Sequence, residues 1–411
     1  MNVSPDFSLP IRVVAPYFVG GILFYILAMV SLLWVEPNIG MSDYRVIGWV
    51  HLYMIGFVMM IIIGAMAQMS VVVAEVHHRY PDLFRWIFPL LSLGTIVLVA
   101  GLYFSPLGMM AGGTLLLCAL GLFAYNLFFT LKTSRRRTTV IRSMQWSTFF
   151  LLIGLGIGIV MASGYAGIVV IEPSYWREFH VFALIGGYVM INIMGVSTVV
   201  LPMFGACNRP SDNDYTISFG MMSGAVVMML ASVWVEWFGW MAFSLAVGSI
   251  LHYMQSVYRI FTTKKRRYSD IWERSVAVAF ASLVVALSVS VYGYISVNEK
   301  AMILGFWFFT TGFLGFLMSA HLYKIVPFLV WFERYVPHID EKAVPMIHEL
   351  LDQKWAKGQW LAGCAGILLV ALAILLENWI LFIGGIAVII ASGAMLLGAI
   401  LKILRFRGVE E

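Results

Sequence analysis

Long apolar runs separated by short polar connections fill almost the whole chain. About twelve of these runs reach the roughly 20 residues that an α-helix needs to cross the hydrocarbon core of a membrane. They lie at 13–35, 46–73, 84–104, 107–131, 146–171, 176–204, 216–236, 238–261, 274–297, 301–328, 359–377 and 379–403. A transmembrane barrel would instead show alternating segments of about ten residues, and the sequence has none. The pattern predicts an all-α polytopic membrane protein of about twelve transmembrane helices.

The composition supports this interpretation. Apolar residues make up 61% of the 411 residues and charged residues only 11%, whereas charged residues are about 25% of a typical soluble protein. We therefore expect a single transmembrane domain over residues 1–411, in contact with membrane lipid.

Basic residues gather in the loops that follow the even-numbered runs. The clearest clusters are Lys132–Arg137 and Lys264–Arg267, and the C-terminal tail adds Lys402 and Arg405. Because positive charge collects on the cytoplasmic side of a membrane, both termini are predicted to be cytoplasmic. The basic clusters are scattered over separate short loops, so the sequence gives no support to nucleic-acid binding.

The ends of runs two, six and ten resemble one another. They read "GAMAQMSVVV" from Gly64, "GVSTVVLPMF" from Gly195 and "AHLYKIVPF" from Ala320, with offsets of 131 and 125 residues. Such a period predicts three units of four helices in a pseudo-threefold arrangement of arcs. The alternative is that helix ends rich in small residues look alike in any membrane bundle.

The longest stretch that does not span is 331–358, predicted to be a cytoplasmic amphipathic connector. Its centre, "AVPMIHELLDQKW", has apolar residues at helical spacing and charged residues opposite them, which predicts an amphipathic helix on the membrane surface. The apolar positions are Val344, Ile347, Leu350, Leu351 and Trp355. His338 and His348 belong to this segment and are expected to be solvated.

Four histidines lie inside apolar runs. His51 and His180 each sit near the start of a run, at similar depth, and an ionisable residue in hydrocarbon is a candidate site residue. The pair could bind a metal or haem, or each could be a hydrogen-bonded structural residue. His252 and His321 form a second candidate set nearer the cytoplasm, either an inner polar site or part of an interfacial aromatic belt.

Other polar residues call for separate interpretations. Gln68, Asn192 and Lys324 lie at membrane depth, so they could line a proton or substrate path, although Lys324 could also extend to the membrane surface. The adjacent His77 and His78 fall in a cytoplasmic loop and are expected to be solvated or near lipid headgroups.

Taken together, these features resemble a known family. About twelve helices with inward termini, histidines on the second, sixth and tenth helices and the threefold run of arcs are similar to the catalytic subunit of haem-copper oxidases and nitric oxide reductases. The stretches "HLYMIGFVMMIIIGAMAQM" and "HLYKIVPFLVWFERY" also resemble NnrS-type bacterial membrane proteins, which contain haem and copper and are linked to nitric oxide stress. The architectural resemblance covers nearly the whole chain.

The resemblance implies roles for the histidines. His51 matches the second-helix ligand of a low-spin haem, and His180 matches a sixth-helix copper ligand. With the second candidate set added, the candidate metal ligands are His51, His180, His252 and His321. The chain departs from the family because run seven has no histidine and run ten has His321 alone. An intact oxygen-reducing centre is therefore not expected, and a reduced form, with His51 and His180 clamping one haem, is the remaining interpretation.

Glycines on these two runs bear on whether a haem fits. Gly56, Gly64, Gly186, Gly187 and Gly195 would leave room for a flat macrocycle, or would let helices pack directly on one another. The sequence does not decide between these two uses.

The leading hypothesis is a haem-binding membrane protein, with copper as a further metal, in redox or diatomic-gas (oxygen or nitric oxide) chemistry or in handling respiratory cofactors. The resemblance implies a b-type haem, the bacterial inner membrane, a quinol or cytochrome electron donor, respiratory-complex subunits as partners and, if the protein turns over, oxidoreductase activity. The alternatives are a secondary transporter or small-molecule carrier and a cofactor-free accessory subunit of a respiratory complex.

Overall fold

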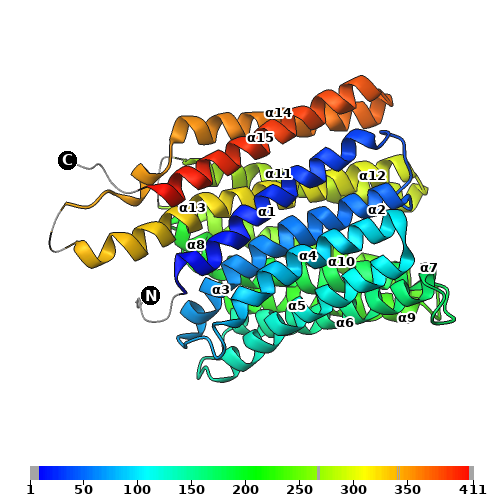
Figure 1. The fold of residues 1–411 in the computed structure, drawn as a ribbon, viewed down its shortest axis with the longest axis horizontal. Coiled ribbons are helices and arrows are strands. Elements are labelled where there is room, and N and C mark those ends of the chain that lie inside the picture. Colours follow the sequence, from blue (N-terminus) through cyan, green and yellow to red (C-terminus); the bar gives the residue numbers. More distant parts are fainter. Residues whose placement is uncertain (1–8, 266–268, 340, 342, 407–411) are drawn as a thin grey trace. The chain divides into compact units, whose positions relative to one another are not determined.

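The computed structural model describes residues 9–265, 269–339, 341 and 343–406, apart from the side chains of 212–214. All regular structure in these ranges is helical (Figure 1). The chain divides into two compact units, which we call the central unit (67–265) and the terminal unit (9–66 with 269–406).

Single helices and helix pairs alternate with three long composite helices. The simple helices are α1 (Ile11–Ser31), α4 (Leu83–Phe104), α5 (Pro106–Lys132), α6 (Thr139–Tyr165), α9 (Asp212–Ser232), α10 (Trp237–Thr262), α11 (Ile271–Ser296), α14 (Gln353–Leu376) and α15 (Trp379–Arg405). The composite helices are α2 (Tyr44–His51), η3 (Leu52–Met59) and α3 (Met60–Ala74); α7 (Ser174–Val181), η4 (Phe182–Met190) and α8 (Ile191–Gly205); and α12 (Glu299–Trp307), η5 (Phe308–Leu314) and α13 (Gly315–Arg334).

The predicted fold class is confirmed. In the described part of the chain, eleven helices are long and apolar enough to cross a membrane, and most begin and end within a few residues of the predicted runs. The remaining predicted run, 238–261, forms α10, which is long enough but less apolar. Large apolar side chains such as Phe104, Leu368 and Ile380 are exposed, as expected for helices that contact lipid.

The order of elements repeats three times along the chain. Each repeat has one single helix, one composite helix with a π-helical middle (η3, η4 or η5), and a pair of helices. The π-helical segments begin at residues 52, 182 and 308, and the fifth residue of each is a glycine: Gly56, Gly186 and Gly312. The predicted repeat of four helices is therefore present in the secondary structure, and its arrangement around a threefold axis stays a prediction.

Glycines let the single helix of each repeat lie directly against the π-helical segment that follows it. A Cβ added to Gly56 would come within 2.5 Å of the Phe24 ring of α1, and one added to Gly312 within 2.6 Å of Ser282 of α11. In the central unit, a Cβ on Gly187 would come within 2.6 Å of Phe150 of α6. These contacts are closer than any side chain at the glycine position permits, so the packing depends on the missing Cβ.

The two helices of a pair also pack closely at glycines. In α14 and α15, which run side by side (Figure 1, orange and red), a Cβ on Gly366 would come within 2.4 Å of Ile389 and one on Gly385 within 2.7 Å of Val370. In the central unit, a Cβ on Gly112 of α5 would lie only 2.2 Å from the backbone of Leu98 on α4. Dispersion between closely packed helices, rather than water exclusion, stabilises such pairs in lipid.

Two side chains at the end of α13 form hydrogen bonds with backbone groups at the ends of two other helices in the terminal unit. The backbone N–H of Ile11, in the first turn of α1, donates to the Glu333 carboxylate at 2.6 Å. The neighbouring Arg334 guanidinium donates to the carbonyls of Leu404 and Phe406 at the end of α15, at 2.8 and 2.7 Å. Helix ends carry backbone groups with no partner in their own helix, so two consecutive residues of α13 stabilise both α1 and α15.

The predicted amphipathic helix within 331–358 is wrong. Two short 3₁₀ turns, η6 (Val336–His338) and η7 (Ile347–Leu350), take its place, and α14 starts afresh at Gln353. Pro345 disfavours helical backbone at the residue before it, and the Asp352 carboxylate accepts from the N–H groups of Lys354 and Trp355, which fixes a new helix start. Residues 340 and 342 lie outside the described residues, and the cytoplasmic location of the connector stays a prediction.

We expect Arg334→Met to lower stability by about 2 kcal/mol, because it removes charge-assisted hydrogen bonds to two helix-terminal carbonyls. Thermal melting of the detergent-solubilised protein measures this loss. The matched control is Arg405→Met, an exposed arginine in the last turn of α15, which should cost well under half as much. Equal losses in the two variants would contradict the capping role of Arg334.

Candidate functional site

His51, in the terminal unit, is the last residue of α2 and directly precedes η3. Its Nδ1 lies 2.8 Å from the Ile47 carbonyl oxygen. A carbonyl can only accept, so Nδ1 carries the proton and the neutral ring has its lone pair on Nε2. The half-buried ring is thus held in the tautomer that a metal ligand needs.

His180, in the central unit, is held in the same tautomer, but by a carbonyl of a different helix. It is the second-last residue of α7, and its Nδ1 lies 2.9 Å from the Gly154 carbonyl oxygen of α6. A Cβ added to Gly158 of α6 would come within 2.9 Å of the ring's Cε1, so the imidazole lies against a glycine surface. Its Nδ1–H is again donated to a carbonyl, and its lone pair is on Nε2.

The two histidines occupy nearly the same place in their repeats. His51 lies one residue before a π-helical segment and His180 two residues before one, while Trp307 and Phe306 take these places in the third repeat. Because His51 and His180 belong to different units, their predicted convergence on one ligand stays a prediction.

The second candidate set is also divided between the units. His252 of α10 shares a hydrogen bond of 2.8 Å between its Nδ1 and the Ser218 Oγ of α9, in the central unit. His321 of α13, in the terminal unit, donates from Nδ1 to the Leu317 carbonyl at 2.7 Å and meets the Trp272 ring edge-on. Within the described ranges, no three His, Cys, Asp or Glu side chains gather closely enough to hold a metal ion.

The glycines of the long helices do not form an empty slot for a macrocycle. The faces of Gly56 and Gly187 are filled by Phe24 and Phe150 as described above, Gly64 lies against Phe18, and Gly195 against Ser143. Gly186 is the least closely packed of the five, since the nearest atom to an added Cβ, Met222 Sδ, is 3.2 Å away. For the other four glycines, close contact with a neighbouring helix is the use that the structure shows. A haem bound to His51 or His180 would have to lie outside these contacts, on the Nε2 side of each ring.

Aromatic residues connect two composite helices within the terminal unit. Trp49 of α2 stacks on Trp307 of α12, with ring centroids 6.2 Å apart and planes inclined by 28°. One turn further on, the Tyr53 hydroxyl donates to the Thr310 carbonyl of η5 at 2.8 Å. These contacts fix the helix that carries His51 against its counterpart in the third repeat.

Lys324 has a charged partner in the terminal unit. Its Nζ lies 2.7 Å from an Asp270 carboxylate oxygen, and both side chains are about three-quarters buried. Asp270 also accepts from the N–H of Glu273 at the start of α11. Lys324 therefore takes part in an ion pair at a helix end and does not extend alone to the membrane surface.

Two buried polar residues of the central unit have unpartnered atoms. The Tyr188 hydroxyl and both amide atoms of Asn192 have no hydrogen-bond partner among the described residues, and the two side chains are 0% and 2% exposed. They lie one turn apart at the junction of η4 and α8. The sequence singles out Asn192 by its depth, whereas nothing in it distinguishes Tyr188 from the many interfacial tyrosines.

The expectation that His78 is solvated is wrong, and the structure instead buries it in the central unit. Its side chain is only 9% exposed; Nε2 donates to the Ala67 carbonyl of α3 at 2.6 Å, and Asn126 of α5 approaches Nδ1 at 3.5 Å. Burial lowers the pKa of His78 to about 4, so the ring is neutral at pH 7. The neighbouring His77 is exposed, as expected.

No protein-family model matches the chain, and no curated protein sequence matches it. The resemblance to haem-copper oxidases, nitric oxide reductases and NnrS-type proteins therefore stays a prediction that rests on the residues quoted for it.

We expect acid to destabilise the protein through His78. Its folded-state pKa of about 4 lies below the ordinary value of about 6.5, so the unfolded chain binds a proton that the folded chain does not. The stabilising effect is complete above about pH 6.5 and is lost as the pH falls toward 4, a change of about 3 kcal/mol.

Melting temperatures measured from pH 7.5 to 4.5 test this expectation. His78→Gln should melt lower than the wild type at pH 7.5 and show a flatter pH dependence, whereas His77→Gln, at the exposed neighbour, should follow the wild type. Parallel curves for all three proteins would show that His78 does not control the acid response.

Proposed function

We propose that this protein is an integral membrane haem protein in which His51 and His180 would be haem ligands. The observation that carries the proposal is that both rings are held in the same tautomer. Each ring donates its Nδ1–H to a backbone carbonyl and so holds its lone pair on Nε2, just before a π-helical segment of a composite helix.

A backbone carbonyl behind a histidine is the arrangement that orients metal ligands. The hydrogen bond fixes the tautomer and the direction of the ring, and it makes the opposite nitrogen more basic. Neutral imidazoles of this kind are the usual axial ligands of b-type haems. A buried imidazole needs such a partner in either role, so the support for ligation comes from the matching places of His51 and His180 just before π-helical segments.

The third repeat supports two ligands rather than three. Trp307 and Phe306 stand where the other repeats have His51 and His180, and His321 lies well beyond η5, in α13. We therefore propose His51 and His180 as the haem ligands, and copper stays a further metal of the proposal, with His252 and His321 also among its candidate ligands.

A haem of this type supplies one-electron transfer and, where an axial position opens, diatomic-gas binding. The chain's own part is to hold the imidazoles in their ligand form and to surround them with apolar side chains that exclude water. We place this role in redox or diatomic-gas chemistry of a bacterial inner membrane with both termini cytoplasmic, with electrons from a quinol or cytochrome donor. If the protein turns over, we expect an oxidoreductase.

The optical spectrum of the purified protein tests the proposal. The wild type should show a Soret band and reduced α and β bands of a low-spin haem, with about one haem per chain. His51→Ala and His180→Ala should each lose most of the low-spin signal, and His348→Ala, at an exposed residue of η7, should leave it unchanged. Gel filtration must show the same monodisperse peak for every variant.

A rescue experiment separates ligation from folding. In His51→Gly, added imidazole should restore the low-spin bands in a concentration-dependent way, because a free imidazole can occupy the place of the missing ring. A wild type that stays colourless when haem is supplied during expression, or spectra that do not change in either alanine variant, would refute the proposal. Substrate uptake by vesicles containing a colourless protein would favour a transporter, and co-purifying respiratory subunits an accessory role.

A further inference from the structure

Two connections of the central unit are joined at one end of its helices. The connection between α3 and α4 (75–82) and the connection between α5 and α6 (133–138) lie at the same end (Figure 1, blue and cyan). The Ser134 hydroxyl donates to the last carbonyl of α3 at 2.8 Å. The Arg136 guanidinium forms an ion pair with the Glu75 carboxylate at 2.6 Å. The two connections therefore form one continuous surface.

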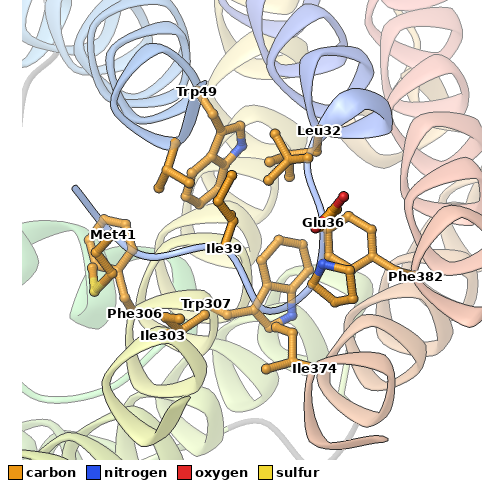
Figure 2. Close-up of a pocket in the computed structure, with 13 residues that line it drawn as sticks. Leu32, Glu36, Ile39, Met41, Trp49, Ile303, Phe306, Trp307, Ile374 and Phe382 are labelled. Carbon is orange, nitrogen blue, oxygen red and sulfur yellow. The ribbon is translucent and has the colours of Figure 1, made fainter. Parts of the chain in front are cut away.

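This surface carries four cations that no carboxylate neutralises. Arg79, Lys132, Arg135 and Arg137, which we call the basic cluster, are exposed and take part in no ion pair within the described part of the chain. The two carboxylates of the α3–α4 connection are each paired with another arginine, at 2.6 and 3.6 Å. The half-open pocket of the terminal unit, in contrast, has Glu36 as the only charged residue of its lining (Figure 2). An anion is therefore attracted to the basic cluster and not to that pocket.

The first cation of the cluster lies over a stack of aromatic rings. The guanidinium carbon of Arg79 is 5.9 Å from the centroid of the Tyr80 ring. The Tyr80 ring stacks on Tyr125 of α5, with centroids 5.2 Å apart and planes inclined by 26°, and Phe129 follows at 4.6 Å from Tyr125. A guanidinium held over an aromatic face keeps its N–H groups available to an anion.

Buried side chains of α5 fix the backbone beneath this stack. The N–H of Arg79 donates to the Thr130 hydroxyl at 3.1 Å, and the N–H of Tyr80 donates to the Asn126 side-chain oxygen at 3.1 Å. Thr130 and Asn126 are both 0% exposed. The connection is thus ordered without a ligand, so binding an anion there does not incur the entropic cost of ordering a loop.

The aromatic residues next to the basic cluster extend into lipid. Tyr125 and Phe128 are 46% and 52% exposed, and they lie near the end of α5, a helix long and apolar enough to span a membrane. Tyrosine is typical of the headgroup level of a bilayer, and an exposed phenylalanine on such a helix contacts acyl chains. The ligand that fits has an anionic group directly beside an apolar part, which favours a lipid over a free anion or a nucleic acid.

We infer that the basic cluster binds the phosphodiester headgroup of an anionic phospholipid, whose acyl chains lie along Tyr125 and Phe128. Arginine presents its N–H groups in a planar fork that matches the oxygens of a phosphate, and basic clusters beside membrane-spanning helices recognise anionic headgroups. The inference is independent of the haem proposal, because it uses neither His51 nor His180.

Native mass spectrometry of the full-length, detergent-solubilised protein, titrated with single lipids, tests the inference. Phosphatidylglycerol, the anionic probe, should bind more than about tenfold more tightly than phosphatidylcholine, which has no net charge. Arg79→Gln should weaken phosphatidylglycerol binding about fivefold, since each cation near an anionic lipid contributes a factor of about five. Arg135→Gln/Arg137→Gln should weaken it more than about tenfold.

Matched controls separate the cluster from general surface charge. Arg274→Gln/Arg405→Gln removes two exposed arginines of the terminal unit and should change phosphatidylglycerol binding less than about twofold. Tyr80→Ala keeps the charge but removes the support of Arg79, so it should weaken binding, whereas Tyr258→Ala, at an exposed tyrosine of α10, should not. Each variant is compared at a temperature at which its melting curve without lipid shows it to be folded.

Three results would overturn the inference. Equal weakening in the two double variants would mean that the lipid follows net charge alone. Phosphatidylglycerol that binds no more tightly than phosphatidylcholine would show that the headgroup charge is not recognised. Displacement of phosphatidylglycerol by an equal concentration of inorganic phosphate or of an oligonucleotide would assign the basic cluster to a free anion or to a nucleic acid.

Discussion

The structure depends on one constraint: inside hydrocarbon, every backbone N–H and C=O must find its partner within the protein. The described chain meets it with helices throughout, and even the π-helical segments keep their bonds by shifting them one residue further. In η5, the Thr310 carbonyl accepts from the N–H of Gly315 and also from the Tyr53 hydroxyl. Where helices end, side chains from distant helices complete the bonding, as Glu333 and Arg334 do for α1 and α15.

The same constraint gives the buried histidines their chemistry. Each ring inside or beside the membrane-spanning helices must place its N–H somewhere, and in His51, His180 and His321 it goes to a carbonyl. The acceptor nitrogen is then fixed on the other side of the ring. The hydrogen bond that allows an imidazole to be buried therefore also fixes the tautomer that a metal ligand needs. For this reason the hydrogen bonds of His51 and His180 fit both a structural role and a ligand role.

The sequence predicts the helices well because a membrane span needs a run of fixed length, and apolar runs of that length are easily recognised. It predicts the repeat from the similar ends of three runs. It does not predict the π-helical segments, whose glycines pack against Phe24, Phe150 and Ser282 of the neighbouring single helices. The helix predicted within 331–358 is wrong because apolar spacing takes no account of Pro345, which disfavours helical backbone at the residue before it.

The site is less predictable than the fold, because burial of a single polar side chain is a tertiary property. His78 follows Val76 and His77 in a short charged loop, and only the approach of Ala67 and Asn126 buries it. Likewise, the Trp49 indole is an ordinary aromatic residue in sequence. Only the structure shows that its buried N–H has no hydrogen-bond partner in the described part of the chain. The histidines, in contrast, stand out in the sequence because hydrocarbon makes them costly.

The hydrogen bond between Ile11 and Glu333 joins residues 322 positions apart, and this separation has a consequence for biosynthesis. On the ribosome, α1 is made first, yet the first-turn partner of its backbone waits until nearly the whole chain has been translated. The central unit is contiguous and can assemble while synthesis continues, whereas the terminal unit can close only when its last helices enter the membrane. A chain truncated before α13 would leave α1 without a complete neighbour, a state that cellular quality control can recognise.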